Sequence, residues 1–169
     1  MRRMALIATL IFVIDQITKI AVVFGLDLKT RHEIDVLSPF LDFRMAWNQG
    51  INFGLFASSA EAMRWVLIVL SLVITAWVWH WISRGNHGKW MQISAGLLIG
   101  GALGNVVDRV AYGAVADFLN MSCCGLENPY SFNVADIAIF AGAFGLVLFG
   151  GKEPPKPGKK PQAPRRKTP

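Results

Sequence analysis

Charged residues are scarce in this chain of 169 residues: only 17% are Asp, Glu, Lys or Arg, whereas 53% are hydrophobic. Such a composition excludes an ordinary water-soluble domain and favours a membrane protein. A helix needs about 20 mostly apolar residues to cross the roughly 30 Å hydrocarbon core of a bilayer. Four segments qualify, at about 4–24, 63–83, 91–111 and 134–151. The sequence therefore predicts an all-α membrane protein with four transmembrane helices.

Cysteine and histidine are also rare, with two and three residues respectively. Cys123 and Cys124 are adjacent, and adjacent Cα atoms lie about 3.8 Å apart, which is below the usual range for a disulfide. No histidine has the spacing of a metal ligand relative to a cysteine or a carboxylate. We therefore expect no disulfide between these cysteines, no metal site and no cofactor.

Lysine and arginine are absent from Tyr112 to Asn133, which is typical of a loop outside the cytoplasm. Eleven of the 17 basic residues instead lie before the first apolar segment, between the second and third, and after the fourth. Both termini are therefore predicted to be cytoplasmic. Attraction to anionic lipids explains the net charge of +6, and no nucleic-acid partner is expected. Residues 152–169, rich in proline and lysine, are predicted to be a disordered basic tail that follows a membrane domain at 1–151.

No A-x-A-like cleavage site follows the first apolar segment promptly, so we expect a retained helix rather than a removed signal peptide. The connection at about 28–60 is too polar to cross a membrane. Its alternating apolar and polar positions, with a turn at Gln49 and Gly50, predict a small extracytoplasmic β element between the first and second helices.

Polar residues interrupt two of the apolar segments at helical spacing. Asp15 and Lys19 share one face of the first segment, and Asn105, Asp108 and Arg109 share one face of the third. A charge facing lipid near the bilayer centre costs about 2.5–3.5 kcal/mol, so these side chains should be paired and turned inward. Two explanations stay open. These residues form salt bridges, Asp15 with Lys19 and Asp108 with Arg109, that hold the helices together, or they support a functional site.

Asp117 and Asp136 have no lysine or arginine near them in sequence that would neutralise them. They lie where the third segment ends and the fourth begins, on one side of the membrane, so they can meet. Gly113 should end the helix and leave Asp117 on irregular backbone that faces a wet cavity, and Asn133 could cap the following helix.

Two neighbouring carboxylates have a definite chemical use. At about 4 Å and an effective dielectric constant near 20, two unit charges repel by about 4 kcal/mol, so the pair should share one proton near neutral pH. The ionised member can then take a proton from an attacking water, while the protonated member hydrogen-bonds the carbonyl oxygen of a peptide. This is aspartic-protease chemistry.

Four motifs, in this order, resemble those of the lipoprotein signal peptidases, also called signal peptidase II: DQITK (15–19), NQGINFG (48–54), GNVVDRVAYGAVADF (104–118) and FNVAD (132–136). The resemblance implies that Asp117 and Asp136 are the catalytic pair. It also implies a set of residues that support the site or bind substrate, namely Asp15, Lys19, Asn48, Gly54, Asn105, Asp108, Arg109 and Asn133.

The resemblance further implies an enzyme of the bacterial inner membrane that acts near the outer face. Its substrates would be prolipoproteins, cut on the N-terminal side of a cysteine that carries diacylglycerol, and globomycin would inhibit it. We expect a monomer surrounded by membrane lipids. Two other classes remain: a small proton-coupled transporter, which would hydrolyse nothing, and a non-enzymatic membrane assembly protein, which would tolerate asparagine at either aspartate of the pair.

Overall fold

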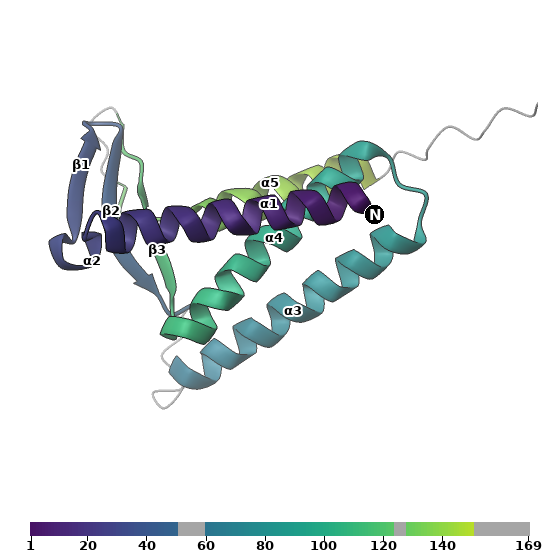
Figure 1. Ribbon diagram of the computed structural model, residues 1–169, viewed down its shortest axis with the longest axis horizontal. Helices are drawn as coiled ribbons and strands as arrows, with labels where there is room; N and C mark the ends of the chain where they lie inside the picture. The colour runs from purple at the N-terminus through teal and green to yellow at the C-terminus, as the bar shows by residue number, and fades with distance from the viewer. Residues whose placement is uncertain (51–59, 124–127, 151–169) are drawn as a thin grey trace, which may run out of the picture.

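The computed structural model describes residues 1–50, 60–123 and 128–150 (Figure 1). Gly54, Cys124 and the predicted tail lie outside the described residues. Three helical segments are long and apolar enough to cross a membrane. They are α1 (Arg2–Lys19), continued by a π-helical segment η1 (Ile20–Gly25), then α3 (Ala60–Arg84) and α4 (Lys89–Tyr112). A fourth apolar helix, α5 (Val134–Gly150), is shorter.

The helix α4 lies at the centre of the helical layer and contacts α1, α3 and α5. In its most apolar window 67% of the residues are buried, against 28% for α1 with η1 and 17% for α3. The apolar residues of α1, α3 and α5 that α4 does not cover point outward, among them Leu10, Trp77 and Phe144. The exposed apolar surface of these helices therefore has the character of a lipid-facing surface.

Glycines allow the helices around α4 to approach closely. Gly96, Gly100 and Gly104 recur every fourth residue on the face that packs against α1, and a Cβ at any of them would clash with α1. Gly142 of α5 lies in the same way against the backbone of α4. Small residues at such spacing let helix backbones pack where no hydrophobic effect drives association. These glycines thereby bring the polar residues of α1, α4 and α5 within hydrogen-bond distance.

A three-stranded antiparallel sheet lies across one end of the helices, in the order β1 (Glu33–Leu37), β2 (Leu41–Asn48) and β3 (Val115–Asn120). The first two strands come from the connection between α1 and α3, after a short helix α2 (Leu28–Arg31). The third strand comes from the connection between α4 and α5. The predicted β element is therefore joined by a strand from a distant part of the chain.

Asp117 lies within β3, so the prediction of irregular backbone at this residue was wrong. The helix does end at Gly113, as expected, because this glycine adopts a left-handed conformation with φ of 80°. The chain then turns at once into β3, where β2 supplies the hydrogen-bond partners that irregular backbone would have lacked.

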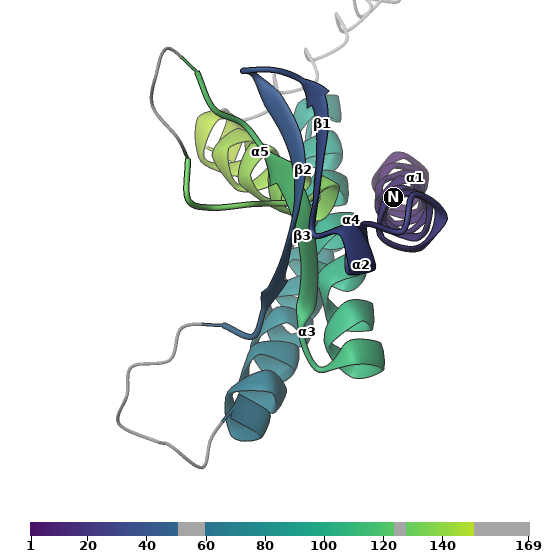
Figure 2. The ribbon, with the colours of Figure 1, turned by 90° about the vertical axis from the view of Figure 1, so that its left-hand side faces the viewer.

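The two faces of the sheet have different neighbours. Figure 2, with the sheet toward the viewer, shows α1 and α2 on one side of it and α5 on the other. Phe43, Met45 and Phe118 pack with Val23 and Leu28 on the α1 and α2 side. Asp117 of β3, by contrast, accepts a hydrogen bond from Asn133, which directly precedes α5.

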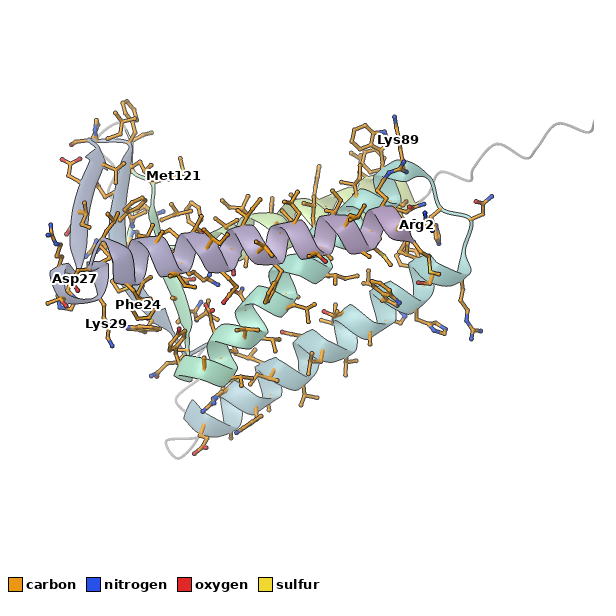
Figure 3. The ribbon with its side chains drawn as sticks, viewed as in Figure 1. Arg2, Phe24, Asp27, Lys29, Lys89 and Met121 are labelled. Atoms are coloured by element: carbon orange, nitrogen blue, oxygen red, sulfur yellow. The ribbon has the colours of Figure 1, made fainter. Side chains whose placement is uncertain are left out.

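The two ends of the helical layer differ in their charges (Figure 3). Arg2 and Lys89 lie at the end away from the sheet, where the connection between α3 and α4 also lies. Asp27 and Lys29 lie at the sheet end. The ends that carry the basic flanking residues are therefore on one side of the molecule, and the sheet is on the other.

Candidate active site

Asp117 lies on β3 opposite Ala46 of β2, and only 3% of its surface is exposed. Its Oδ2 accepts a hydrogen bond from Asn48 Nδ2 at 3.1 Å, and its Oδ1 accepts one from Asn133 Nδ2 at 2.6 Å. Burial, and after it the charge of Asp136, raises the pKa of Asp117 to about 7. This carboxyl group can therefore gain or lose a proton near neutral pH.

Asn48 is held in place by the turn that follows it. Its Oδ1 accepts a hydrogen bond from the backbone N–H of Gly50 at 2.9 Å, which leaves Nδ2 directed at Asp117. Gly50 has a φ of 96°, a conformation that side chains with a Cβ disfavour. The turn predicted at Gln49 and Gly50 thus orients a side chain of the site.

Asp136 lies in the first turn of α5 and forms a reciprocal capping arrangement with Asn133. The backbone N–H of Asp136 donates to Asn133 Oδ1 at 2.9 Å, and the backbone N–H of Asn133 donates to Asp136 Oδ2 at 3.2 Å. Asn105 Nδ2 donates to the other oxygen, Oδ1, at 2.9 Å. The proposed cap at Asn133 is therefore present, and the fully buried Asn133 joins the two aspartates.

The start of α5 is fixed against β3 by backbone hydrogen bonds. The N–H groups of Phe118 and Leu119 both donate to the carbonyl of Phe132, and the N–H of Phe132 donates back to Leu119. This pairing places Asn133 one residue beyond the strand contact. As a result, Asp117 and Asp136 share a binding partner although they are 19 residues apart.

A second group of charges lies deeper between the helices. Lys19 Nζ contacts Asp15 Oδ2 at 2.8 Å, Asp108 Oδ2 at 2.7 Å and Asn105 Oδ1 at 3.2 Å. An ammonium group has three N–H donors, so these three acceptors satisfy it. We call Asp15, Lys19 and Asp108 the ion triad; all three residues are at most 4% exposed.

The ion triad holds the backbone directly in front of each aspartate of the pair. Asp108 Oδ2 accepts the N–H of Ala116, which precedes Asp117, at 3.2 Å. Asp15 Oδ1 accepts the N–H of Ala135, which precedes Asp136, at 3.0 Å. The two carboxylates of α1 and α4 therefore position β3 and α5 relative to each other.

The structure tests the two salt bridges expected from the sequence, Asp15 with Lys19 and Asp108 with Arg109. Asp15 and Lys19 form the expected salt bridge, but the pairing of Asp108 with Arg109 was wrong, because Asp108 pairs with Lys19 of another helix. Arg109 instead donates from Nη1 to the carbonyl of Asn105 at 3.4 Å and interacts electrostatically with Asp136, Asp117 and Asp108. Neighbours on one helix face compete with partners that packing brings closer.

Two residues of the site were missed by sequence reasoning. Gln16 Nε2 lies 3.1 Å from Asp15 Oδ2 and 3.3 Å from Asp108 Oδ1, so it bridges the acids of the ion triad. Gly104 leaves room for Asp15, whose Oδ2 would lie 2.5 Å from a Cβ at that position. Gln16 lies within the motif DQITK, and Gly104 follows Gly96 and Gly100 at a spacing of four residues, so both patterns were present in the sequence.

Of the ten residues expected at the site, the described part of the chain brings nine together, and Gly54 lies outside it. Within residues 1–50, 60–123 and 128–150, no group of three or more His, Cys, Asp or Glu has the arrangement of a metal site. The nine residues supply carboxyl, amide, guanidinium and ammonium groups.

Comparisons with known proteins show which family this chain is similar to. The family model described as Signal peptidase (SPase) II matches residues 7–150. The lipoprotein signal peptidase of Methylobacterium radiotolerans is 42% identical over 167 residues, which cover 96% of this chain and 95% of the relative. That of Rhodopseudomonas palustris (strain ATCC BAA-98 / CGA009) is 38% identical over 80% of this chain and 83% of the relative.

Solved structures have the same fold. A bacterial membrane enzyme determined by the in meso method at 1.9 Å resolution superposes with a TM-score of 0.73 at 25% identity, over 89% of this chain and 94% of that chain. A second, at 2.3 Å resolution, gives a TM-score of 0.70 at 26% identity, over 86% and 85%.

Proposed function

Because the chain belongs to the signal peptidase II family and removes signal peptides from prolipoproteins, we propose that it does so as an aspartic endopeptidase with Asp117 and Asp136 as the catalytic pair. The observation that carries this proposal is the shared partner Asn133, which binds Asp117 through its side chain and Asp136 through a reciprocal cap. The family assignment displaces the transporter and the assembly protein.

The two aspartates have environments suited to different roles. Asp117 is buried and has a pKa raised to about 7, so it holds the shared proton below that pH. Asp136 is less buried and accepts hydrogen bonds from Asn105 Nδ2 of α4 and from the backbone N–H of Asn133 at the start of α5. In this assignment Asp117 is the acid and Asp136 the base.

Peptide hydrolysis then needs one water and these two groups. Asp136 takes a proton from the water while the water oxygen attacks the scissile carbonyl carbon. Asp117 donates its proton to the carbonyl oxygen as that oxygen gains negative charge. As the C–N bond breaks, Asp136 passes the proton it accepted to the leaving amine nitrogen, and the hydroxyl proton of the tetrahedral intermediate returns to Asp117 as the C=O bond re-forms. The remaining positive charge near the site, Arg109, faces both carboxylates and stabilises the negative charge of the pair.

The remaining features of the enzyme follow from its family and its shape. We infer four transmembrane helices, with α5 as the fourth, both termini in the cytoplasm of a bacterium, and the sheet near the outer face of the inner membrane. The basic residues at the end opposite the sheet support this orientation (Figure 3). A substrate whose cysteine carries diacylglycerol would then reach the site from within the bilayer.

The test is cleavage by the purified, detergent-solubilised chain of a prolipoprotein with and without diacylglycerol on its cysteine. We expect wild type to cut only the lipidated substrate, just before the cysteine, and globomycin to inhibit it. Asp117→Asn and Asp136→Asn should cut neither. Asp35→Asn, which changes an exposed carboxylate on β1, is the matched control and should retain activity. Cleavage by Asp117→Asn or Asp136→Asn at the wild-type rate would refute the aspartic mechanism.

A further inference from the structure

A polar cavity lies beside the sheet. It has a volume of about 450 Å³ and is lined by the polar residues Glu33, Asp42, Arg44, Asn120, Ser122 and Asn128, with Ser38 and Pro39 of the hairpin. Asn120 lies on β3, three residues beyond Asp117, and donates to the carbonyls of Asn128 and Tyr130. The same connection between β3 and α5 supplies Asn133, which donates to Asp117, so the cavity adjoins the proposed catalytic pair.

One wall of this cavity is built by hydrogen bonds rather than by loose loop residues. Asn120, only 4% exposed, donates from Nδ2 to the carbonyls of Asn128 and Tyr130 at 2.8 and 3.1 Å. Its Oδ1 accepts a hydrogen bond from Ser122 Oγ at 3.2 Å, and Ser131 Oγ donates to the carbonyl of Arg44 at 2.9 Å. These contacts hold Asn128, Tyr130 and Ser131 against β2 and β3 along this wall of the cavity.

The charged groups of the cavity remain available to a ligand. Glu33 and Arg44 are directly opposite each other on β1 and β2, yet among the described residues no ion pair within 4 Å involves Glu33, Asp42 or Arg44. Two carboxylates and one guanidinium give the cavity a formal charge of −1. It should therefore favour a basic ligand group over an acidic one.

We propose that this cavity binds the polypeptide that follows the lipidated cysteine and prefers a basic to an acidic residue near the fourth position after the cleaved bond. This inference rests on the proposed function. Ala46 lies opposite Asp117 and Asp42 lies opposite Asn120, three residues further along β3, which is about 10 Å at 3.3 Å per residue. An extended substrate covers the same distance in about three residues, which leads from the cysteine to the fourth residue.

The polarity of the cavity excludes the substrate segment before the cysteine as its ligand. The segment before the cysteine is the apolar signal peptide, which must remain in the membrane and would gain nothing from carboxylate and amide groups. The segment after the cysteine leaves the membrane on the side of the sheet. Only this second segment can supply the polar chain and the basic side chain that the cavity fits.

The test compares two diacylglyceryl-modified prolipoproteins that differ only in the third to fifth residues of the mature chain, counting the cysteine as first. One carries lysines at these positions and the other carries aspartates. With the full-length wild-type enzyme, we expect KM for the lysine substrate to be about two- to five-fold lower, the range for one half-exposed ion pair. The value of kcat should be the same for both, and the preference should shrink at high salt.

Charge reversal on the enzyme identifies the cavity as the cause. Asp42→Lys should invert the preference, and Asp42→Asn should reduce it without adding a new charge. Glu61→Lys is the matched control, because Glu61 is an exposed acid at the start of α3 away from this cavity, and it should leave the preference unchanged.

Two outcomes would overturn the inference. If wild type cleaves both substrates with equal KM, or if its preference survives Asp42→Lys and Asp42→Asn, the cavity does not bind the mature chain, although the peptidase function stands. If wild type cleaves neither lipidated substrate, the proposed function itself fails.

Discussion

The ion triad and the pair formed by Asp117 and Asp136 both bring carboxyl groups close together, yet they differ in how the charge is balanced. In the triad, Lys19 contacts Asp15 and Asp108 at 2.8 and 2.7 Å. In the pair, asparagine side chains and one backbone N–H group bind the carboxylates, and no cation within the described residues forms a salt bridge with either. Asp117 is buried and faced by Asp136, which raises its pKa to about 7, so this group can exchange a proton near neutral pH.

Backbone hydrogen bonds nevertheless connect the ion triad to the pair formed by Asp117 and Asp136. Each acid of the triad accepts the backbone N–H of the alanine that precedes Asp117 or Asp136, namely Ala116 or Ala135. The triad thus fixes the backbone, and the side chains that follow it are those that we propose to be catalytic. Substitutions in the two groups should therefore separate stability from catalysis.

The largest expected effect is on catalysis, from neutralising the pair. Asp117→Asn and Asp136→Asn should lower kcat by about 10²- to 10⁴-fold, the contribution of a positioned general acid or base. Both variants should remain folded, since asparagine keeps the size of the side chain and the triad is intact. Cleavage assays together with thermal unfolding in detergent check this, and a variant that loses its fold along with its activity would contradict the separation.

The largest expected effect on stability comes from the triad. Lys19→Met would leave Asp15 and Asp108 buried without their cation and should destabilise the protein by about 3–5 kcal/mol. Thermal unfolding of the purified variant measures this. Lys29→Met, which removes an exposed lysine near the sheet, is the control and should change the melting temperature little. Equal melting temperatures for the two variants would show that the triad is not structural.

A smaller effect should come from the residue that joins the pair. Asn133→Ser keeps an oxygen that can cap α5 but removes the Nδ2 donor to Asp117 Oδ1. We expect kcat to fall about 10- to 100-fold, the value of one hydrogen bond to a charged group, with little change in melting temperature. Asn133→Ala, which also removes the cap, should lower stability by about a further 1 kcal/mol. If serine and alanine behave alike in both assays, the cap does not contribute.

The smallest and most graded effect is that of pH. The pKa of Asp117 is raised from 3.8 to about 7, so between these values the folded protein holds a proton that the unfolded chain has released. Stability should therefore fall as pH rises from about 4 to about 7 and level off above. The rate should also fall as pH rises above about 7, because the pair loses its shared proton. Asp117→Asn should abolish this pH dependence of the melting temperature and be more stable than wild type at pH 8.

Much of the fold and the site could be predicted from local patterns. The apolar segments, the helix end at Gly113 and the shared faces of Asp15 with Lys19 and of Asn105 with Asp108 depend on residues within a few positions of one another. Helical geometry alone connects such residues. The prediction that Asp117 and Asp136 form the catalytic pair came from the motifs and from the lack of a nearby cation in sequence, and it stays a prediction.

Other features depended on contacts between distant segments. The pairing of Asp108 with Lys19 rather than Arg109, the position of Asp117 on a strand, and the bridge formed by Gln16 each involve groups tens of residues apart. The pattern of residues within one helix does not indicate which other helix will pack against its polar face. Glycines such as Gly104 permit the close approach, but only the packed structure shows which side chain fills the space.

The sequence by itself determined that this chain enters a membrane, which of its residues are too polar to face lipid, and which family it resembles, because hydropathy, charge and motif are properties of neighbouring residues. Only the tertiary structure decided which charges neutralise one another and which remain free to exchange a proton. The reason is physical: a carboxylate in a buried site responds to the groups around it, and for Asp117 those groups come from α1, β2 and the start of α5 rather than from its own strand.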